Sequence, residues 1–152
     1  MDKKIDFCTI AVASDHAGVN LKAYLIIYLK SLGLEVKDFG PSDPNVSVDY
    51  PDYAYKVADA VATGACKYGI VICGSGIGVS IAANRNPLIR AALCVNPNMA
   101  ELSRLHNDAN VLALGARIID EETAKESVRM FLTTDFAGGR HIQRVSKLSK
   151  RN

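Results

Sequence analysis

The amino-acid sequence predicts a single α/β domain: a five-stranded, doubly wound parallel sheet with helices on both faces. Five short runs have the length of strands, and most are apolar throughout, as in a sheet covered on both sides. They are Cys8–Ser14, Glu35–Phe39, Tyr68–Cys73, Ala91–Val95 and Val111–Leu114. Helical patterns alternate with them over Asn20–Leu32, Tyr53–Thr63, Gly78–Asn84, Pro97–Leu105 and Glu121–Thr133. Because strand and helix alternate, we expect right-handed crossovers and a Rossmann-type sheet that binds ligands beyond the carboxyl ends of its strands.

The composition is that of one folded domain. The chain has 152 residues, of which 49% are apolar and 22% charged. A formal net charge of +2 is too small to argue for nucleic acid or a membrane as a partner, and the basic excess at Lys147, Lys150 and Arg151 is typical of a solvated tail. The sequence contains no signal-peptide pattern and no membrane span, so we expect a cytoplasmic protein.

The four cysteines are expected to be reduced thiols, because they form no CxxC pairs in a chain that is large enough to fold without disulfides. Cys8 and Cys94 lie within predicted strands and Cys66 precedes one, so burial without chemistry is the expectation for these three. The three histidines and the cysteines lack the spacing of a zinc site. We therefore predict neither a metal nor a cofactor.

Polar or glycine-rich segments follow four of the predicted strands. They are Asp15–Gly18, Cys73–Gly78, Asn96-Pro97 and Gly115–Arg117. If the strand order is 2-1-3-4-5, the first two of these segments flank one crevice. Asp15, His16, Cys73 and Ser75 would then share it.

The segment Cys73–Gly78 combines a thiol, a hydroxyl and three alternating glycines. Glycines let a ligand approach the backbone, and the amides of the following helix N-terminus favour an anion and a thiolate at Cys73. The alternative is a tight turn around a buried, inert cysteine. Val79 stands where a dinucleotide fingerprint needs glycine and where a cysteine phosphatase needs arginine, so neither class is expected. A receiver-like domain would need a lysine where Arg117 stands.

Three other groups of residues have both a structural and a functional interpretation. The pair Asp15-His16 could simply cap a helix, and His106 could cap the end of another or donate a proton near neutral pH. Arg140 and Arg144 are one helical turn apart, so they could be solvated or could share one phosphate. An apolar stripe on the same terminal segment, 138–152, indicates docking on a partner subunit, with Arg117, Arg140 and Arg144 serving a site at the interface. The stripe consists of Ile142, Val145 and Leu148.

Together the motifs resemble type B ribose-5-phosphate isomerase. They lie in the family's order along almost the whole chain: Asp15–Gly18, Asp49–Pro51, Ile72–Gly78, Arg104–Asn110 and Gly138–His141. The resemblance implies a flavodoxin-like sheet and a homodimer or homotetramer whose sites are built from both subunits. It also implies the cofactor-free interconversion of ribose 5-phosphate and ribulose 5-phosphate in the non-oxidative pentose phosphate pathway.

The resemblance also implies a role for each matching residue. Aldose–ketose isomerisation through a cis-enediol needs one base at the carbons and donors at the oxygens. Cys73 is the implied base, Ser75 and the amides of Gly76 to Gly78 hold the enediolate charge, and His106 opens the furanose ring with Asp15 nearby. The other implied substrate contacts are His16, Tyr50, Gly74, Asn107 and a phosphate clamp of Arg117, Arg140 and Arg144.

Two alternatives stay open at this point. Galactose-6-phosphate isomerase subunits share the fold and the loop, and allose 6-phosphate is only one carbon longer, so a 6-phosphohexose remains a possible substrate. A non-catalytic phosphosugar-binding module would need no base. A related branch of the family has serine at the cysteine position and a glutamate where this chain has Val79, which leaves Cys73 as the base in the loop.

Overall fold

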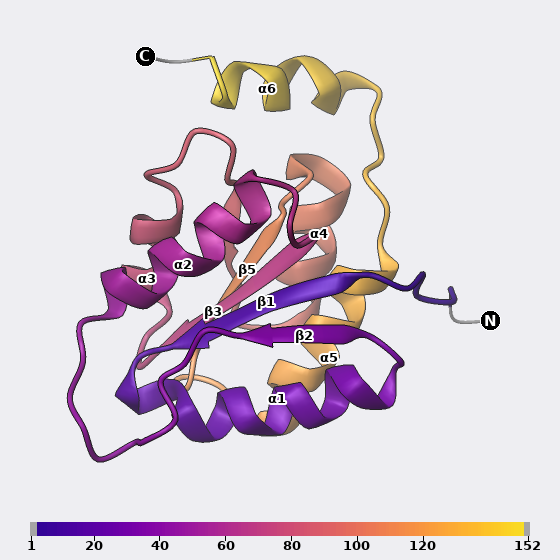
Figure 1. The fold of residues 1–152 in the computed structure, drawn as a ribbon. Helices are drawn as coiled ribbons and strands as arrows, with labels where there is room; N and C mark the ends of the chain where they lie inside the picture. Colours follow the sequence, from indigo (N-terminus) through magenta and orange to yellow (C-terminus); the bar gives the residue numbers. More distant parts are fainter. Residues whose placement is uncertain (1–2, 151–152) are drawn as a thin grey trace.

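The computed structural model describes residues 3–150, in which one parallel sheet lies between two layers of helices (Figure 1). Residues 1–2 and 151–152, among them Arg151 of the basic tail, lie outside the described residues. The strands are β1 (Thr9–Ser14), β2 (Glu35–Asp38), β3 (Tyr68–Cys73), β4 (Ala91–Leu93) and β5 (Val111–Gly115). The helices are the short 3-10 turn η1 (His16–Gly18), α1 (Val19–Ser31), α2 (Tyr50–Ala62), α3 (Ile77–Ala83), α4 (Pro97–Asn107), α5 (Glu121–Thr133) and α6 (Arg140–Leu148).

The strand order is β2-β1-β3-β5-β4, with every neighbouring pair parallel. The predicted fold class is confirmed, but the predicted order 2-1-3-4-5 is wrong for the last two strands. All residues of β5 are buried, whereas the three residues of β4 are only half-buried. More apolar surface is therefore buried when β5 lies inside the sheet and the short β4 forms the edge.

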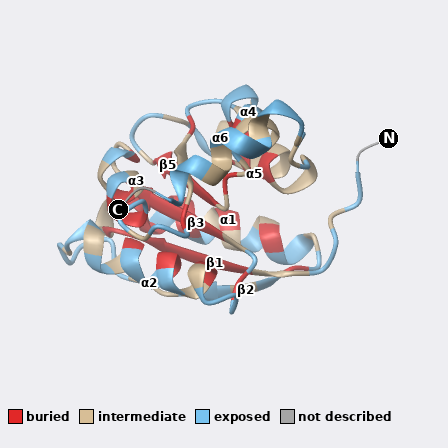
Figure 2. Ribbon diagram, turned by 90° about the horizontal axis from the view of Figure 1, so that it is seen from above, coloured by how far each residue is buried: buried red, intermediate tan, exposed pale blue. Residues whose placement is uncertain are grey.

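Each face of the sheet carries its own apolar core. Leu25 and Leu29 of α1 and Phe131 of α5 pack with α4 against one face. Val57 of α2 and Val79 of α3 pack against the other. In Figure 2 the buried residues run along the strands and along the sides of the helices that face them. The sheet is thus covered on both sides, and only its ends are left for a ligand.

The helix boundaries follow local capping chemistry. The side chain of Asn96 accepts a hydrogen bond from the amide of Met99 at the start of α4, and Asp120 does the same for Thr123 in α5, both at 2.8 Å. Helix α2 begins at Tyr50, three residues before the predicted start, because Pro51 is tolerated in a first turn that needs no amide donor. Among residues 3–150, every helix falls short of the length and apolarity that a membrane crossing requires.

Helix α6 stands apart from the layers. It follows the segment 134–139 and contains no buried residue, and Figure 1 shows it well away from the carboxyl ends of the strands. Ile142 and Leu148, from its predicted apolar stripe, are 59% and 58% exposed. The predicted stripe is thus present and largely uncovered within the described residues.

Substitutions on the two sides of α1 test the packing. Leu25 is fully buried and Ile27 is 72% exposed. We expect Leu25→Ala to lower the free energy of unfolding by about 2–5 kcal/mol, because a cavity replaces apolar contacts. Ile27→Ala, the matched control on the same helix, should stay within about 0.5 kcal/mol of the parent. Urea unfolding followed by circular dichroism measures both, and equal losses would contradict this packing.

Candidate active site

A cleft of about 620 Å³ opens at the carboxyl ends of β1, β3 and β5. It is the location expected for a ligand in a doubly wound sheet. Seven of the residues predicted for the site line it: Asp15, Tyr50, Cys73, Gly74, Ser75, Gly78 and Arg117. Three isoleucines that the sequence did not single out line it as well, Ile77, Ile81 and Ile118.

The Cys73 loop is shaped by hydrogen bonds of its own. The Cys73 side chain lies at the end of buried β3 and is 4% exposed. The amide of Gly76 donates to its Sγ at 3.2 Å, and the amide of Ile77 donates to Ser75 Oγ at 3.2 Å. The amides of Gly76 and Ile77, which were expected to bind the substrate, thus donate hydrogen bonds within the loop. The first holds the Cys73 sulfur against the loop backbone, and the second leaves the Ser75 hydroxyl proton free to be donated.

Gly76 is the one loop position where glycine is required by both backbone and space. Its φ of +79° is one that L side chains rarely adopt. An added Cβ would also lie 2.5 Å from Leu93 and 2.9 Å from the backbone carbon of Leu114. Gly76 is buried and does not line the cleft, so its contribution is to turn the chain tightly enough for its amide to reach Cys73.

Arg117 reaches the cleft because β5 pairs directly with β3. The pairing continues past the strand ends, where Ala116 N donates to Cys73 O and Arg117 N donates to Gly74 O, each at 2.9 Å. The guanidinium lies over Gly74: a Cβ added there would be 3.2 Å from Arg117 Nη1. A cation is thus held over Gly74, the residue that follows the thiol, because β5 is paired directly with β3.

Asp15 and His16 have separate tasks after β1. Asp15 is 8% exposed, and its Oδ1 accepts a hydrogen bond from Gly18 N at 3.2 Å, so it caps η1. The same side chain lines the cleft. His16 does not line the cleft. Its Nδ1 accepts from the amide of Val48 at 3.2 Å, which ties the long loop before α2 to the end of β1. Tyr50, just after that loop, lies against Gly78, where an added Cβ would be 2.6 Å from its ring.

The other predicted site residues lie elsewhere in the chain. His106 and Asn107 are in the last turn of α4, and Arg140 and Arg144 are on α6. Because α4 returns the chain to the amino end of β5, its last turn is roughly 15 Å, the length of a five-residue strand, from the edge that carries Cys73. None of these four residues lines the Cys73 cleft.

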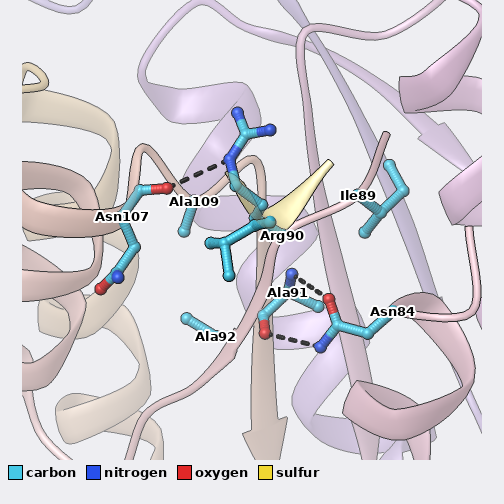
Figure 3. A pocket seen from close by; sticks show the side chains of 8 residues that line it. Asn84, Ile89, Arg90, Ala91, Ala92, Asn107 and Ala109 are labelled. Atoms are coloured by element: carbon cyan, nitrogen blue, oxygen red, sulfur yellow. Dashed lines mark hydrogen bonds between the residues drawn. The ribbon is translucent and has the colours of Figure 1, made fainter. Parts of the chain in front are cut away.

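The two distant segments meet each other. The rings of His106 and His141 stack with centroids 4.5 Å apart. Desolvation, followed by the charges of His106, Arg140 and Arg144, lowers the pKa of His141. Asn107 and Leu148 also border a second cavity of about 450 Å³ beside Arg90, which Figure 3 shows from close by. The helix ends therefore form a second cluster of predicted site residues.

The remaining thiols contrast with Cys73. All four cysteines are free. Burial raises the pKa of Cys94 to about 11, and burial also raises the pKa of Cys66 and of Cys8. None of these three lines the cleft; Cys66 and Cys94 are buried as expected, whereas Cys8 is only partly buried. Within residues 3–150 no three His, Cys, Asp or Glu side chains come together as metal ligands.

Comparison with known proteins decides the family. A family model described as Ribose/Galactose Isomerase matches residues 10–148. The chain belongs to that family. The resemblance drawn from the motifs is confirmed, and the Ribose/Galactose Isomerase fold accounts for the sheet and the cleft described above.

Relatives within the Ribose/Galactose Isomerase family match over nearly the whole chain. Ribose-5-phosphate isomerase B of Escherichia coli (strain K12) is 47% identical, over 92% of this chain and 93% of the relative. The structure of ribose 5-phosphate isomerase B from Thermotoga maritima matches with a TM-score of 0.92 at 49% identity, over 95% of this chain and 99% of that one. The enzyme from Mycoplasma genitalium with bound ribulose-5-phosphate matches with a TM-score of 0.91 at 40% identity, over 96% of both chains.

Thiol labelling tests the environments assigned to the cysteines. At pH 8 about one Cys94 side chain in a thousand is a thiolate, since its pKa is about 11, and only the thiolate reacts with iodoacetamide. We expect Cys73, which lines the cleft, to be labelled well before Cys94. Peptide mass spectrometry of samples taken at successive times measures the labelling of each cysteine. Labelling of Cys94 should rise as the pH approaches 11. A Cys94 that reacts at pH 8 as fast as Cys73 would contradict this assignment.

Proposed function

We propose that this chain interconverts ribose 5-phosphate and ribulose 5-phosphate. The observation that carries the proposal is a thiol at the floor of a cleft, beside a guanidinium, in a member of the Ribose/Galactose Isomerase family. Relatives named ribose-5-phosphate isomerase B at 40–49% identity support the pentose substrate, one of them with ribulose-5-phosphate bound. No feature of the cleft favours a 6-phosphohexose or a role limited to binding.

In the proposed reaction Cys73 moves one proton between adjacent carbons. Its thiolate, stabilised by the amide of Gly76, takes the proton from C2 of the open-chain aldose, and the C1 oxygen gains a proton to give the cis-enediol. Return of the proton to C1, with loss of the proton from the C2 oxygen, gives the ketose. Val79, which stands at the glutamate position of the related branch, is buried in the core. The cysteine is therefore the base that the loop offers.

The other cleft residues would bind and polarise the substrate. Ser75 donates its hydroxyl proton to an enediolate oxygen, because its own oxygen is already engaged by the amide of Ile77. Asp15 and Tyr50, which both line the cleft, accept or donate hydrogen bonds at the sugar hydroxyls. Arg117 supplies the positive charge that the phosphate or the enediolate requires.

We propose that a second copy of the chain completes the site. His106, Asn107, Arg140 and Arg144 lie away from the Cys73 cleft of their own chain, yet their chemistry is what the reaction lacks there: a proton donor for ring opening and two cations for the phosphate. The exposed stripe of α6 and the exposed isoleucines at the cleft, Ile77, Ile81 and Ile118, are apolar surfaces that a homodimer would cover. Segment 138–152 would dock on the partner.

In such a dimer the partner's His106 opens the furanose and its arginines clamp the phosphate, while Arg117 belongs to the chain that supplies Cys73. We further assign the enzyme to the cytoplasm, because a catalytic thiol is kept reduced there.

Removal of the thiol tests the base. We expect Cys73→Ala to lower turnover of ribose 5-phosphate by a factor of about 10²–10⁴, because proton transfer loses its base. Binding of ribose 5-phosphate, measured by calorimetry, should persist because the arginines remain. Cys66→Ala is the matched control and should keep near-normal activity. A Cys73→Ala enzyme with near-normal activity would remove Cys73 as the base.

The same coupled assay, run on the parent protein with allose 6-phosphate and galactose 6-phosphate, ranks these hexose phosphates against ribose 5-phosphate.

Mixed dimers test whether the site is shared. Cys73→Ala and His106→Ala should each be deficient as homodimers. A mixed dimer, purified through two different affinity tags, would hold one intact site and one site that lacks both groups, so it should recover about half of the parental activity. If each site were built from one chain, the mixed dimer would stay as deficient as the two homodimers.

A further inference from the structure

The turn that ends α4 has a backbone conformation that is uncommon outside glycine. Asp108 has a φ of 45°, the one non-glycine residue with positive φ in the described part of the chain. Few residues other than glycine adopt this left-handed conformation, aspartate and asparagine among them. It is placed directly after His106 and Asn107, the two residues of α4 assigned to substrate, so whatever holds this turn also fixes the direction of those side chains.

Two arginines hold the turn from opposite sides. Arg90, just before β4, donates from Nε to the carbonyl oxygens of Asn107 at 3.1 Å and Asp108 at 3.0 Å, and its Nη2 lies 3.4 Å from Asp108 Oδ2. Figure 3 shows its bond to the Asn107 carbonyl. Arg104, inside α4, donates from Nη1 to Asp108 Oδ1 at 2.9 Å and to the Ala109 carbonyl at 2.5 Å. The Asp108 carboxylate therefore bridges two guanidinium groups.

Arg104 also binds the segment that leads to α6. It is 5% exposed and lies against the rings of Tyr68 and Phe131. Its Nε donates to the carbonyl of Thr134 at 3.3 Å, at the start of residues 134–139, which we call the strap. A few residues on, the amide of Ala137 donates to the carbonyl of Leu105 at 3.1 Å. One buried cation thus touches both segments that carry the second cluster of site residues.

We propose that Arg90 and Arg104 are positioning residues for the isomerisation: through Asp108 they fix the turn that presents His106 and Asn107 to the partner's cleft. The inference rests on the proposed function, in which those two residues act on substrate. Neither arginine lines the Cys73 cleft. A guanidinium suits this task better than an ammonium, because its planar fork can bind a carboxylate and neighbouring carbonyls together.

Arg90 is the better residue to vary, because it is partly exposed whereas Arg104 is deeply packed. The experiment uses Arg90→Met and Arg90→Lys, with Arg129→Met as the control, an arginine paired with Glu126 on its own helix α5. Two rates are measured at saturating substrate. One is net conversion of ribose 5-phosphate, which needs ring opening. The other is exchange of the C1 hydrogen of ribulose 5-phosphate with deuterium from solvent, followed by NMR, which needs no ring opening because ribulose 5-phosphate is already open.

We expect Arg90→Met to lower net conversion roughly tenfold or more, as a displaced general acid does, and to lower the exchange by less than about threefold. His106→Ala should show the same split. Arg90→Lys should recover part of the net conversion, and Arg129→Met should match the parent in both rates.

The inference is overturned if Arg90→Met keeps net conversion within about twofold of the parent, or if both rates fall by one factor, as a loss of folded protein would cause. If circular dichroism shows that Arg90→Met does not fold, the same two rates are compared for Arg90→Lys. A larger loss of net conversion than of exchange supports the role, and an equal loss or no loss of the two rates overturns it. Failure of the proposed function is distinct, because the parent enzyme itself would then show neither rate.

Discussion

The pairing of β5 with β3 is the interaction on which the site depends. Parallel strands end at a common edge, and these two continue their hydrogen bonding into the loops that follow, from Ala116 to Cys73 and from Arg117 to Gly74. This pairing places the Cys73 thiol, the Ser75 hydroxyl and the Arg117 guanidinium on neighbouring backbone segments, and no loop has to move to bring them together. With β4 between them, as the sequence order suggested, the same residues would lie two strand spacings apart, about 10 Å.

Much of this architecture could be predicted from the sequence because it depends on local patterns. Apolar runs and helical periodicity located the five strands and helices α1 to α5 of the described chain but not the short turn η1, and the glycines after Cys73 marked the loop that lines the cleft. The order of β4 and β5 could not be read in this way, because it depends on how much surface each strand buries against the others. The isoleucines of the cleft escaped notice for a similar reason: whether an apolar residue on α3, such as Ile77 or Ile81, or after β5, such as Ile118, is exposed depends on neighbours that a local pattern does not show.

The direction of the helices explains why the predicted residues fall into two clusters. In a parallel sheet every connecting helix returns the chain to the amino edge, so a residue in the last turn of α4 must lie far from residues that follow a strand. His106 and Cys73 are therefore separated by topology, whatever their side chains do. The family resemblance implied one site for both residues. The fold keeps them apart within one chain, and the proposed dimer would bring them together across the subunit boundary.

The strap between α5 and α6 sets the distance between the end of α4 and the start of α6. Its start is fastened to Arg104 and its middle to the end of α4, and beyond Ala137 two glycines with positive φ lead into α6. One extended residue spans about 3.3–3.6 Å, so adding or removing one residue would shift α6 by more than the length of a hydrogen bond. The number of residues in the strap thus limits how far Arg140 and Arg144 can lie from the end of α4, so an inserted or deleted residue would move both arginines together.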